Sequence, residues 1–283
     1  MFASLTDRSW LWLAAECYLA GLLLGTYFVV RGGRRSAGWI NTIIAAGYLF
    51  QLVGLSLRGR AVGGCPLGNT FEIFQFTAWS AITLYFFVGV TFRLSLLGYF
   101  TSSLAAAVTL LSLSIPAWDA TRRAHIFGGN AWIELHAALA LFSYGVFALL
   151  ALTSGMFLLR HFSLKSKHPG GPFSFLPSIL DLDHISVRLL VAGVTLMTTS
   201  LAVGAVYWLR EPERVNLTKL LVTVAIWAAY TAALGLRLRG RLLSKRFAWV
   251  GVGLFAAALL SLWPIDASRY PREGNPPAPA APR

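Results

Sequence analysis

Eight apolar stretches dominate this chain and limit what it can fold into. They lie at residues 10–30, 38–56, 71–92, 97–115, 132–159, 187–208, 219–236 and 247–263. A helix needs about 20 mostly apolar residues to cross a bilayer, and each stretch is close to that length. Because 57% of the 283 residues are hydrophobic and only 12% are charged, a water-soluble globular domain is excluded. The sequence therefore predicts an all-α, polytopic membrane bundle of about eight transmembrane helices.

The stretches are predicted to form one bundle over residues 1–264, followed by a flexible Pro-rich outer tail over 265–283. No basic segment precedes the first stretch, whereas Arg31–Arg35 follows it, so it reads as an uncleaved span with the N-terminus outside. Alternation then places four loops inside: 31–37, 93–96, 160–186 and 237–246. Together with Arg188 at the rim of the third, they carry 13 of the 24 Lys and Arg residues, which is a small majority. We expect an N-out, C-out protein of the bacterial inner (cytoplasmic) membrane.

The excess of positive charge has an explanation in this topology. The net charge is +13, but the basic residues lie between apolar stretches, where they orient the spans and meet lipid headgroups. Membrane lipid is therefore an expected partner and nucleic acid is not. The only cysteines, Cys17 and Cys65, form no C-x-x-C motif, so the chain is neither a dithiol oxidoreductase nor itself a c-type cytochrome.

Tryptophans are concentrated at one end of the predicted spans. Only Trp39 and Trp249 lie near predicted inner ends. Six lie near predicted outer ends: Trp10, Trp12, Trp118, Trp132, Trp208 and Trp263. An aromatic belt occupies both membrane interfaces, so this imbalance suggests an aromatic surface on the outer side, although a belt alone also accommodates it.

The third predicted span has a recognisable start. In the outer loop 57–70, Pro66 prevents a helix from beginning earlier. Asn69 or Thr70 is predicted to cap the span, and Glu72 lies in its first turn, where the helix dipole favours a negative charge. Elsewhere, Gly21 and Gly25 form a G-x-x-x-G that predicts close helix contact.

Few ionisable residues fall where they could perform chemistry. Intramembrane charges are functional candidates by default, but Glu72 and Glu134 also suit helix starts, and Glu16 suits a hydrogen-bonded bundle position. His184 lies at the predicted inner end of the sixth span, directly after Asp183, which is a candidate N-cap of that span. No nucleophile–base pair or zinc-ligand spacing is present, so no catalytic constellation is found and an enzyme is not expected. His136, four residues after Trp132, is a candidate haem ligand or a hydrogen-bonded bundle residue.

Several short motifs, in order along the chain, resemble the cytochrome c assembly family, which includes CcsA-type haem-handling proteins and HemX/YpjD-like proteins. The first is Cys65-Pro-Leu-Gly-Asn-Thr-Phe-Glu72 with Ala78-Trp-Ser80, and the second is Trp132-Ile-Glu-Leu-His136 with Ser143-Tyr144. Later positions also match: Leu180 to Arg188, Thr198, Gly204, Lys219, Trp227 and Leu236 to Arg241. The resemblance covers about residues 65–263.

The resemblance implies haem handling during attachment to apocytochrome c, with His136 as an outer-face ligand of haem iron. The sequence departs from the haem-transfer members in its last outer loop, which has one tryptophan, Trp208, and no Trp-rich signature. A second outer histidine is missing after the last span, and Arg237 stands where a channel histidine is expected. These departures place the chain closer to the HemX/YpjD-like branch.

The outer aromatic and basic residues complete the predicted haem site. They could stack on a porphyrin and pair with its propionates, or serve only as interface anchors: Trp118, Trp132, Trp208, Arg122, Arg123 and Arg210. The preferred reading is a non-enzymatic accessory protein of c-type cytochrome biogenesis that handles or presents haem, with another assembly membrane protein as a partner. The alternatives are a HemX-like regulator that acts on a tetrapyrrole-synthesis enzyme through cytoplasmic loops such as 160–186, and a small-solute transporter.

Overall fold

The computed structural model describes residues 5–30, 37–92, 95–125, 130–165, 177–210 and 217–267. Its main elements are α1 (Asp7–Val30), α2 (Ala37–Val62), α3 (Thr70–Phe92), α4 (Ser95–Ser114), α5 (Ala131–Lys165), α6 (Ile179–Arg210), α7 (Leu217–Leu238) and α8 (Ser244–Ala267). A short 3-10 helix, η3 (Pro116–Asp119), follows α4. Each predicted span corresponds to one α-helix, and no strand occurs in these ranges.

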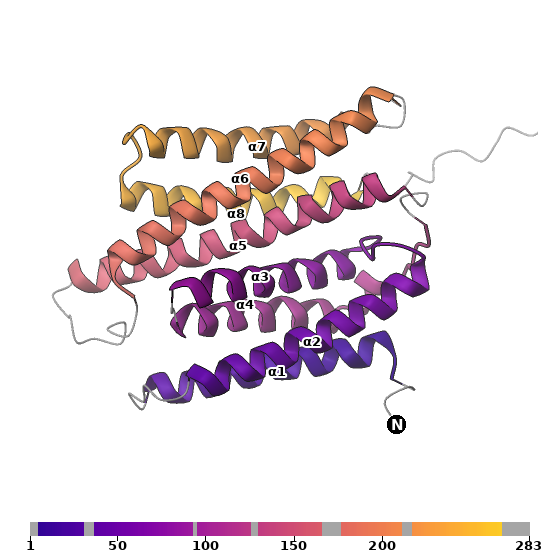
Figure 1. Ribbon diagram of the computed structural model, residues 1–283, viewed down its shortest axis with the longest axis horizontal. Coiled ribbons are helices and arrows are strands. Elements are labelled where there is room, and N and C mark those ends of the chain that lie inside the picture. Colours follow the sequence, from indigo (N-terminus) through magenta and orange to yellow (C-terminus); the bar gives the residue numbers. More distant parts are fainter. Residues whose placement is uncertain are drawn as a thin grey trace, which may run out of the picture.

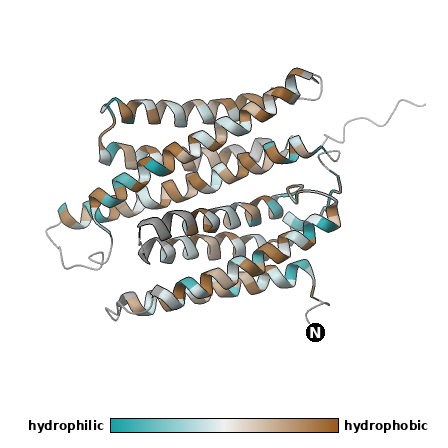
Figure 2. Ribbon diagram, in the orientation of Figure 1, coloured by the Kyte–Doolittle hydropathy of each residue, from teal (hydrophilic) through white to brown (hydrophobic). Residues whose placement is uncertain are grey.

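The helices have the length and composition of membrane spans. Five meet both requirements over their described residues: Asp7–Phe28, Gly38–Val62, Ala131–Lys165, Ile179–Val206 and Leu220–Leu238. In α4, residues Gly98–Ser114 form a shorter apolar helix. Hydrophobic residues occur along the helices (Figure 2), and many large ones are exposed, as expected where lipid rather than water is the solvent. The chain is a multi-pass helical membrane bundle.

The bundle consists of two sets of four helices that lie side by side (Figure 1). Helices α1–α4 form one set and α5–α8 the other, and α3 packs against α5 where the sets meet. Helix α1 begins and α8 ends at the same end of the bundle, where η3 also lies. We call this the η3 end; α2, α4 and α6 end there, and α3, α5 and α7 begin there.

Small residues allow helices to approach closely within and between the two sets. A Cβ atom added at Gly21 would lie 3.5 Å from Ile44, and one added at Gly25 only 2.4 Å from the Tyr99 ring on α4. The predicted close contact at the G-x-x-x-G is therefore confirmed. Between the sets, a Cβ at Gly145 of α5 would lie 2.1 Å from Ser80 Oγ on α3, so only glycine fits there.

Helices α5 and α6 pack antiparallel along most of their length. From one end to the other, His136 contacts Gly204, Phe147 contacts Gly193, and Thr153 accepts a hydrogen bond from Ser186 at 3.0 Å. The Phe147 ring also stacks on Tyr230 of α7, with ring centroids 3.6 Å apart. Another link joins α6 to α7, because Trp227 Nε1 donates to Thr198 Oγ1 at 2.9 Å.

Three helices extend further than the apolar stretches predicted. Helix α2 continues to Val62, so the loop before α3 begins after that residue rather than at residue 57. Helices α5 and α6 extend into the predicted loop 160–186, because polar residues at the membrane surface remain helical although they are not hydrophobic. The predicted N-cap at Asp183 is wrong: α6 begins earlier, and Ser178 Oγ accepts a hydrogen bond from Asp181 N at 3.1 Å.

Two predictions concern residues outside the described ranges, namely the basic loop Arg31–Arg35 and most of the Pro-rich tail. The shared end of the first and last helices agrees with termini on one side of the membrane. The N-out, C-out orientation itself stays a prediction.

Candidate functional site

The part of α5 at the η3 end carries two of the predicted site residues on one face. Asn130 caps this helix, because its Oδ1 accepts a hydrogen bond from Trp132 N at 3.0 Å. Residues four apart lie above one another on a helix, so Trp132 and His136 share a stripe that runs toward the η3 end. Trp132 is 67% exposed, whereas His136 is half-buried against α6.

Helix α6 holds the His136 imidazole by its Nδ1 side. Nδ1 lies 2.7 Å from the backbone carbonyl oxygen of Ser200 and 3.1 Å from Ser200 Oγ. The Ser200 hydroxyl in turn donates to the backbone carbonyl of His136 at 2.8 Å. A Cβ atom added at Gly204 would lie 2.7 Å from both Nδ1 and Cε1 of the ring, so the absence of a side chain at this position makes room for the imidazole.

Trp208 lies on the same stripe of α6 as Ser200 and Gly204, since the three are spaced four residues apart. Continuing the antiparallel register by one turn beyond His136 brings Trp132 of α5 and Trp208 of α6 to the same level at the η3 end. Trp208 is 40% exposed, and in the described part of the chain neither indole makes a ring contact with another aromatic side chain. The structure therefore places His136 against Ser200 and Gly204 of α6, with Trp132 and Trp208 one turn further along α5 and α6, respectively.

Of the remaining predicted site residues, Trp118, Arg122 and Arg123 belong to the other set of helices, whereas Arg210 ends α6. Trp118 of η3 packs against Phe74, with ring centroids 4.8 Å apart, and is only partly buried. Arg122 forms an ion pair with Asp7 at 3.0 Å. The Arg123 backbone lies beside Gly68 in the turn between α2 and α3.

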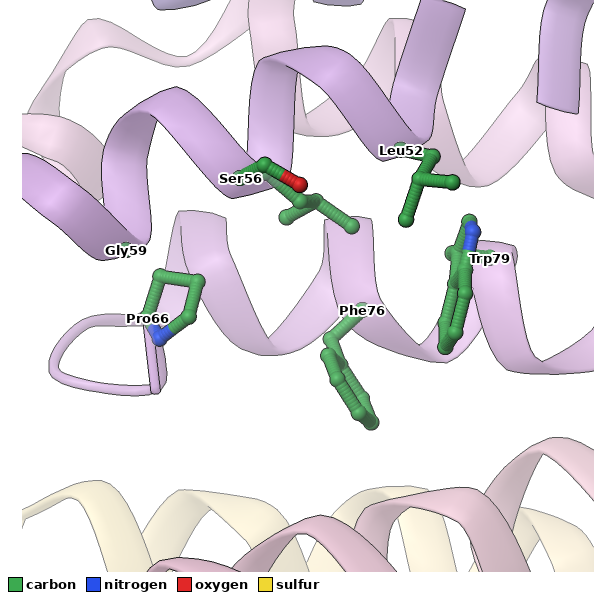
Figure 3. A pocket seen from close by; sticks show the side chains of 7 residues that line it. Leu52, Ser56, Gly59, Pro66, Phe76 and Trp79 are labelled. Carbon is green, nitrogen blue, oxygen red and sulfur yellow. The ribbon is translucent and has the colours of Figure 1, made fainter. Parts of the chain in front are cut away.

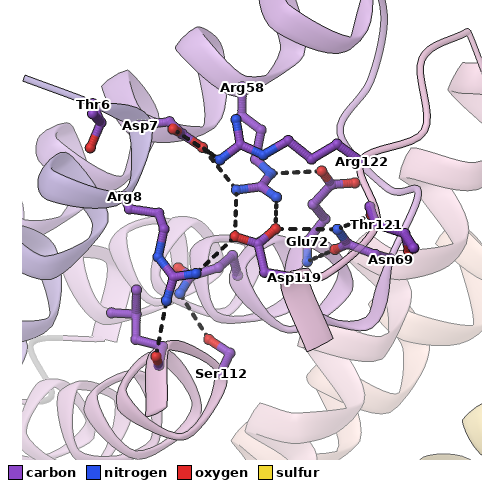
Figure 4. A network of polar contacts seen from close by, with 12 residues as sticks. Thr6, Asp7, Arg8, Arg58, Asn69, Glu72, Ser112, Asp119, Thr121 and Arg122 are labelled. Carbon is purple, nitrogen blue, oxygen red and sulfur yellow. Dashed lines mark hydrogen bonds and ion pairs between the residues drawn. The ribbon is translucent and has the colours of Figure 1, made fainter. Parts of the chain in front are cut away.

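Arg58 is the centre of an ion network that the sequence reasoning missed (Figure 4). Its side chain is fully buried near the end of α2, and its guanidinium contacts three carboxylates. Nε donates to Glu72 at 2.6 Å, Nη1 donates to Asp7 at 2.8 Å, and Nη2 pairs with Asp119. The guanidinium carbon also lies 4.7 Å from the centre of the Phe71 ring, as in a cation–π contact.

Two further arginines balance the charge of this network. Arg8 pairs with Asp119 at 3.0 Å, and Arg122 pairs with Asp7, so three cations face three carboxylates. The network ties the start of α1, the end of α2, the start of α3 and η3 together at one end of the bundle. The sequence holds one sign of this network, namely that Arg58 is followed 14 residues later by Glu72 on the next helix. Hydropathy alone does not distinguish such a buried pair from charged residues in a loop.

The start of α3 confirms the predicted cap. Glu72 N donates to Asn69 Oδ1 at 2.8 Å, while Glu72 Oε2 accepts a hydrogen bond from Gly68 N at 2.6 Å. The pair differs from a capping box in one respect, because Glu72 accepts from the N–H of Gly68 rather than from that of the cap residue Asn69. Glu72 therefore lies in the first turn of α3, as one of the two interpretations predicted. Its carboxylate is also the one that accepts from Arg58 Nε.

A cavity of about 200 Å³ lies between α2 and α3. Figure 3 shows Pro66 and Gly59 at one end of it and Trp79 at the other, with Leu52, Ser56 and Phe76 between them. Small-molecule sites usually enclose about 300–1,000 Å³. The cavity is smaller than that, and none of the predicted haem-site residues lines it.

Cys65 lies in the turn between α2 and α3, next to acidic groups. The Glu134 carboxylate lies against the backbone of Gly64, and a Cβ at Gly64 would be only 2.5 Å from Glu134 Oε1. Burial first, and then the negative charges of Glu134 and Glu72, raise the pKa of the Cys65 thiol to about 11. This thiol is therefore protonated and a weak nucleophile at neutral pH. Among the described residues, no group of three or more His, Cys, Asp or Glu side chains could hold a metal ion.

Comparison with known proteins identifies the family. The sequence model described as cytochrome C assembly protein matches residues 67–263. Protein HemX of Brevibacillus brevis is 28% identical over 145 residues, which cover 51% of this chain and 53% of that protein. Protein HemX of Bacillus subtilis (strain 168) is 25% identical over 180 residues, covering 62% and 63%.

A third relative is cytochrome c biogenesis protein CcsA of Porphyra purpurea, which is 26% identical over 222 residues, covering 62% of this chain and 68% of that protein. The chain thus spans between about half and two thirds of the length of these relatives. Several residues in the matched region make contacts between elements, among them Glu72 with Arg58, His136 with Ser200, and Trp227 with Thr198. The chain belongs to the cytochrome c assembly protein family.

Proposed function

We propose that this protein is an accessory component of c-type cytochrome biogenesis in a bacterial inner membrane, and that it binds haem at the outer ends of α5 and α6. The observation that carries the proposal is the environment of His136. Its Nδ1 is occupied by the Ser200 carbonyl, while no hydrogen bond of its Nε2 is present among the described residues. An imidazole held in this way is ready to bind a metal through Nε2.

The residues around His136 fit a haem. Trp132 and Trp208 present exposed indoles one turn further out, and aromatic faces of this kind stack on a porphyrin. If haem were bound here, it would supply an iron that His136 Nε2 could ligate. His125 does not supply a second ligand in this arrangement, because its ring packs against Gly63 at the turn between α2 and α3. His136 is therefore the histidine that we propose as the haem ligand.

The proposal assigns different roles to the two sets of helices. The α5–α6 pair binds haem through His136, Trp132 and Trp208. Helices α1–α4 and η3, with the Arg58 network, form a rigid support next to it. Trp118 and Arg122 have partners within that support, which is why the proposed haem contacts do not rest on them.

Haem binding can be tested by titrating hemin into the purified protein in detergent and recording the Soret band. We expect the wild-type protein to bind hemin, the His136→Ala variant to lose the band, and added imidazole to restore part of it through the vacated space. His161→Ala is a matched control, since that histidine lies near the other end of α5. Wild-type protein that takes up no hemin, even when co-expressed with an assembly partner, would refute the proposal.

A second candidate function is favoured by the similarity to proteins named HemX. In this function the protein regulates a tetrapyrrole-synthesis enzyme through cytoplasmic loops such as 160–186. This function needs no haem at His136. If deletion of the chain changes the cellular level of tetrapyrrole precursors, and His136→Ala does not, the regulatory role is favoured over haem handling.

A further inference from the structure

Ser200 and Gly204 have a specific effect on His136, which follows from the chemistry of the atoms in contact. A carbonyl oxygen carries no proton, so at 2.7 Å from Ser200 O the Nδ1 atom must itself be the donor. If Nδ1 were unprotonated, two lone pairs would face each other at that distance. The contact therefore requires a proton on Nδ1.

The Ser200 hydroxyl is consistent with the same assignment. Its oxygen donates to the His136 backbone carbonyl at 2.8 Å, so its proton is not available to an unprotonated Nδ1 at 3.1 Å. The hydroxyl thus links the two helix backbones, while the Ser200 carbonyl receives the imidazole proton. With Nδ1 protonated in the neutral ring, Nε2 carries the lone pair.

Gly204 sets the distance at which these contacts form. With no side chain there, the imidazole lies directly on the α6 backbone one turn beyond Ser200. A methyl group would approach Nδ1 and Cε1 to 2.7 Å, which is closer than real Cβ contacts, and both atoms belong to a rigid ring. The ring would have to move away from α6 and so from the Ser200 carbonyl.

We infer that Ser200 and Gly204 are positioning residues that hold His136 in the Nδ1–H tautomer, with the Nε2 lone pair available as the haem ligand. This inference rests on the proposed function for the identity of the ligand, but the tautomer is a property of the protein without haem. In water the Nε2–H tautomer of a neutral imidazole is the more populated one, so the structure selects the less common form.

The tautomer can be measured directly by nitrogen-15 NMR of the full chain in detergent, labelled at histidine and free of haem. The His136→Ala variant identifies the signals of that residue among the five histidines. We expect wild-type His136 to show a protonated Nδ1 and an unprotonated Nε2. A protonated Nε2, or averaging between the two forms, overturns the inference.

Three variants separate positioning from general packing. Gly204→Ala should abolish the tautomer preference and weaken hemin binding by about 10- to 100-fold, the range typical of lost contacts behind a metal ligand. Gly155→Ala on α5 is the control, because a Cβ there meets nothing within 4 Å. Ser200→Ala keeps the backbone carbonyl, so it should retain the tautomer. Loss of the tautomer in Ser200→Ala would assign the selection to the hydroxyl and contradict the assignment to the carbonyl.

The two proposals fail in different ways. A wild-type protein with the expected tautomer and no hemin uptake refutes haem binding and leaves the positioning intact. Hemin uptake with an unselective His136 tautomer refutes the positioning and leaves haem binding intact.

Discussion

Replacing Arg58 should reveal how strongly the ion network holds the η3 end together. The Arg58→Met variant keeps a side chain of similar length but removes the cation. Asp119 then retains Arg8 and Asp7 retains Arg122, but Glu72 loses its ion pair with Arg58 while it remains buried. Removing one partner of a buried ion pair costs about 3–5 kcal/mol. Because Arg58 and Glu72 are both fully buried, we expect a loss within that range.

The loss should arise mainly from the carboxylate that remains unpaired. A second change, Glu72→Gln, removes that charge but keeps an oxygen that can accept the Gly68 N–H. The Arg58→Met/Glu72→Gln double variant should therefore be more stable than Arg58→Met alone, by at least about 1 kcal/mol. Arg60→Met is the matched control, since Arg60 is exposed on the same helix and forms no ion pair among the described residues. It should change stability by less than about 0.5 kcal/mol.

The free energy of unfolding can be measured by titrating SDS into the detergent-solubilised protein and following helicity by circular dichroism. The reasoning fails if Arg58→Met loses less than about 1 kcal/mol, because a central buried cation would then contribute no more than a surface ion pair. It fails equally if the double variant is less stable than Arg58→Met alone.

Three further predictions concern the turn before α3 and the topology. Asn69→Leu with Thr70→Val should lower stability by roughly 1–2 kcal/mol through loss of the cap, and an unchanged midpoint in the same SDS titration would place the cap elsewhere. With its raised pKa, Cys65 should react with a maleimide at pH 8 at least ~10-fold more slowly than an ordinary thiol, and faster as pH rises toward 11. Glu134→Gln removes a negative charge, lowers that pKa and should speed the reaction; no change would exclude the carboxylate as a cause. A reporter that is active only in the cytoplasm, fused after Arg283, should be inactive, and activity would reverse the assigned orientation.

The helices could be predicted from the sequence because an apolar stretch of about 20 residues has few alternatives to a membrane span. Their ends could not be predicted as well. Hydropathy shows where a helix leaves the lipid, but the backbone hydrogen bonds of the helix can extend beyond that point. Helix α2 therefore extends past Arg58 to Val62, and α6 begins at Ile179, before its apolar stretch. The cap at Asn69 was predictable because it depends on neighbouring residues only.

The candidate site was predictable only in part. The spacing of Trp132 and His136 placed both on one helix face, but nothing in the sequence showed that Ser200 and Gly204 would lie opposite His136. That pairing depends on the register between α5 and α6, which is set by contacts along the whole length of both helices. The network around Arg58 was missed for the same reason, since the carboxylates that Arg58 contacts are up to 61 residues away from it in the chain.

The ion network has a consequence for how the protein is made. All six charged members lie between Asp7 and Arg122, in the part of the chain that precedes α5. During synthesis, the buried guanidinium of Arg58 can therefore meet its three carboxylates as soon as η3 has left the ribosome and the first four helices have entered the bilayer. The first set of helices then has its internal charge neutralised before α5 is inserted beside it. Gly145 and Ser80 provide the close contact at which that later helix docks onto a half that is already assembled.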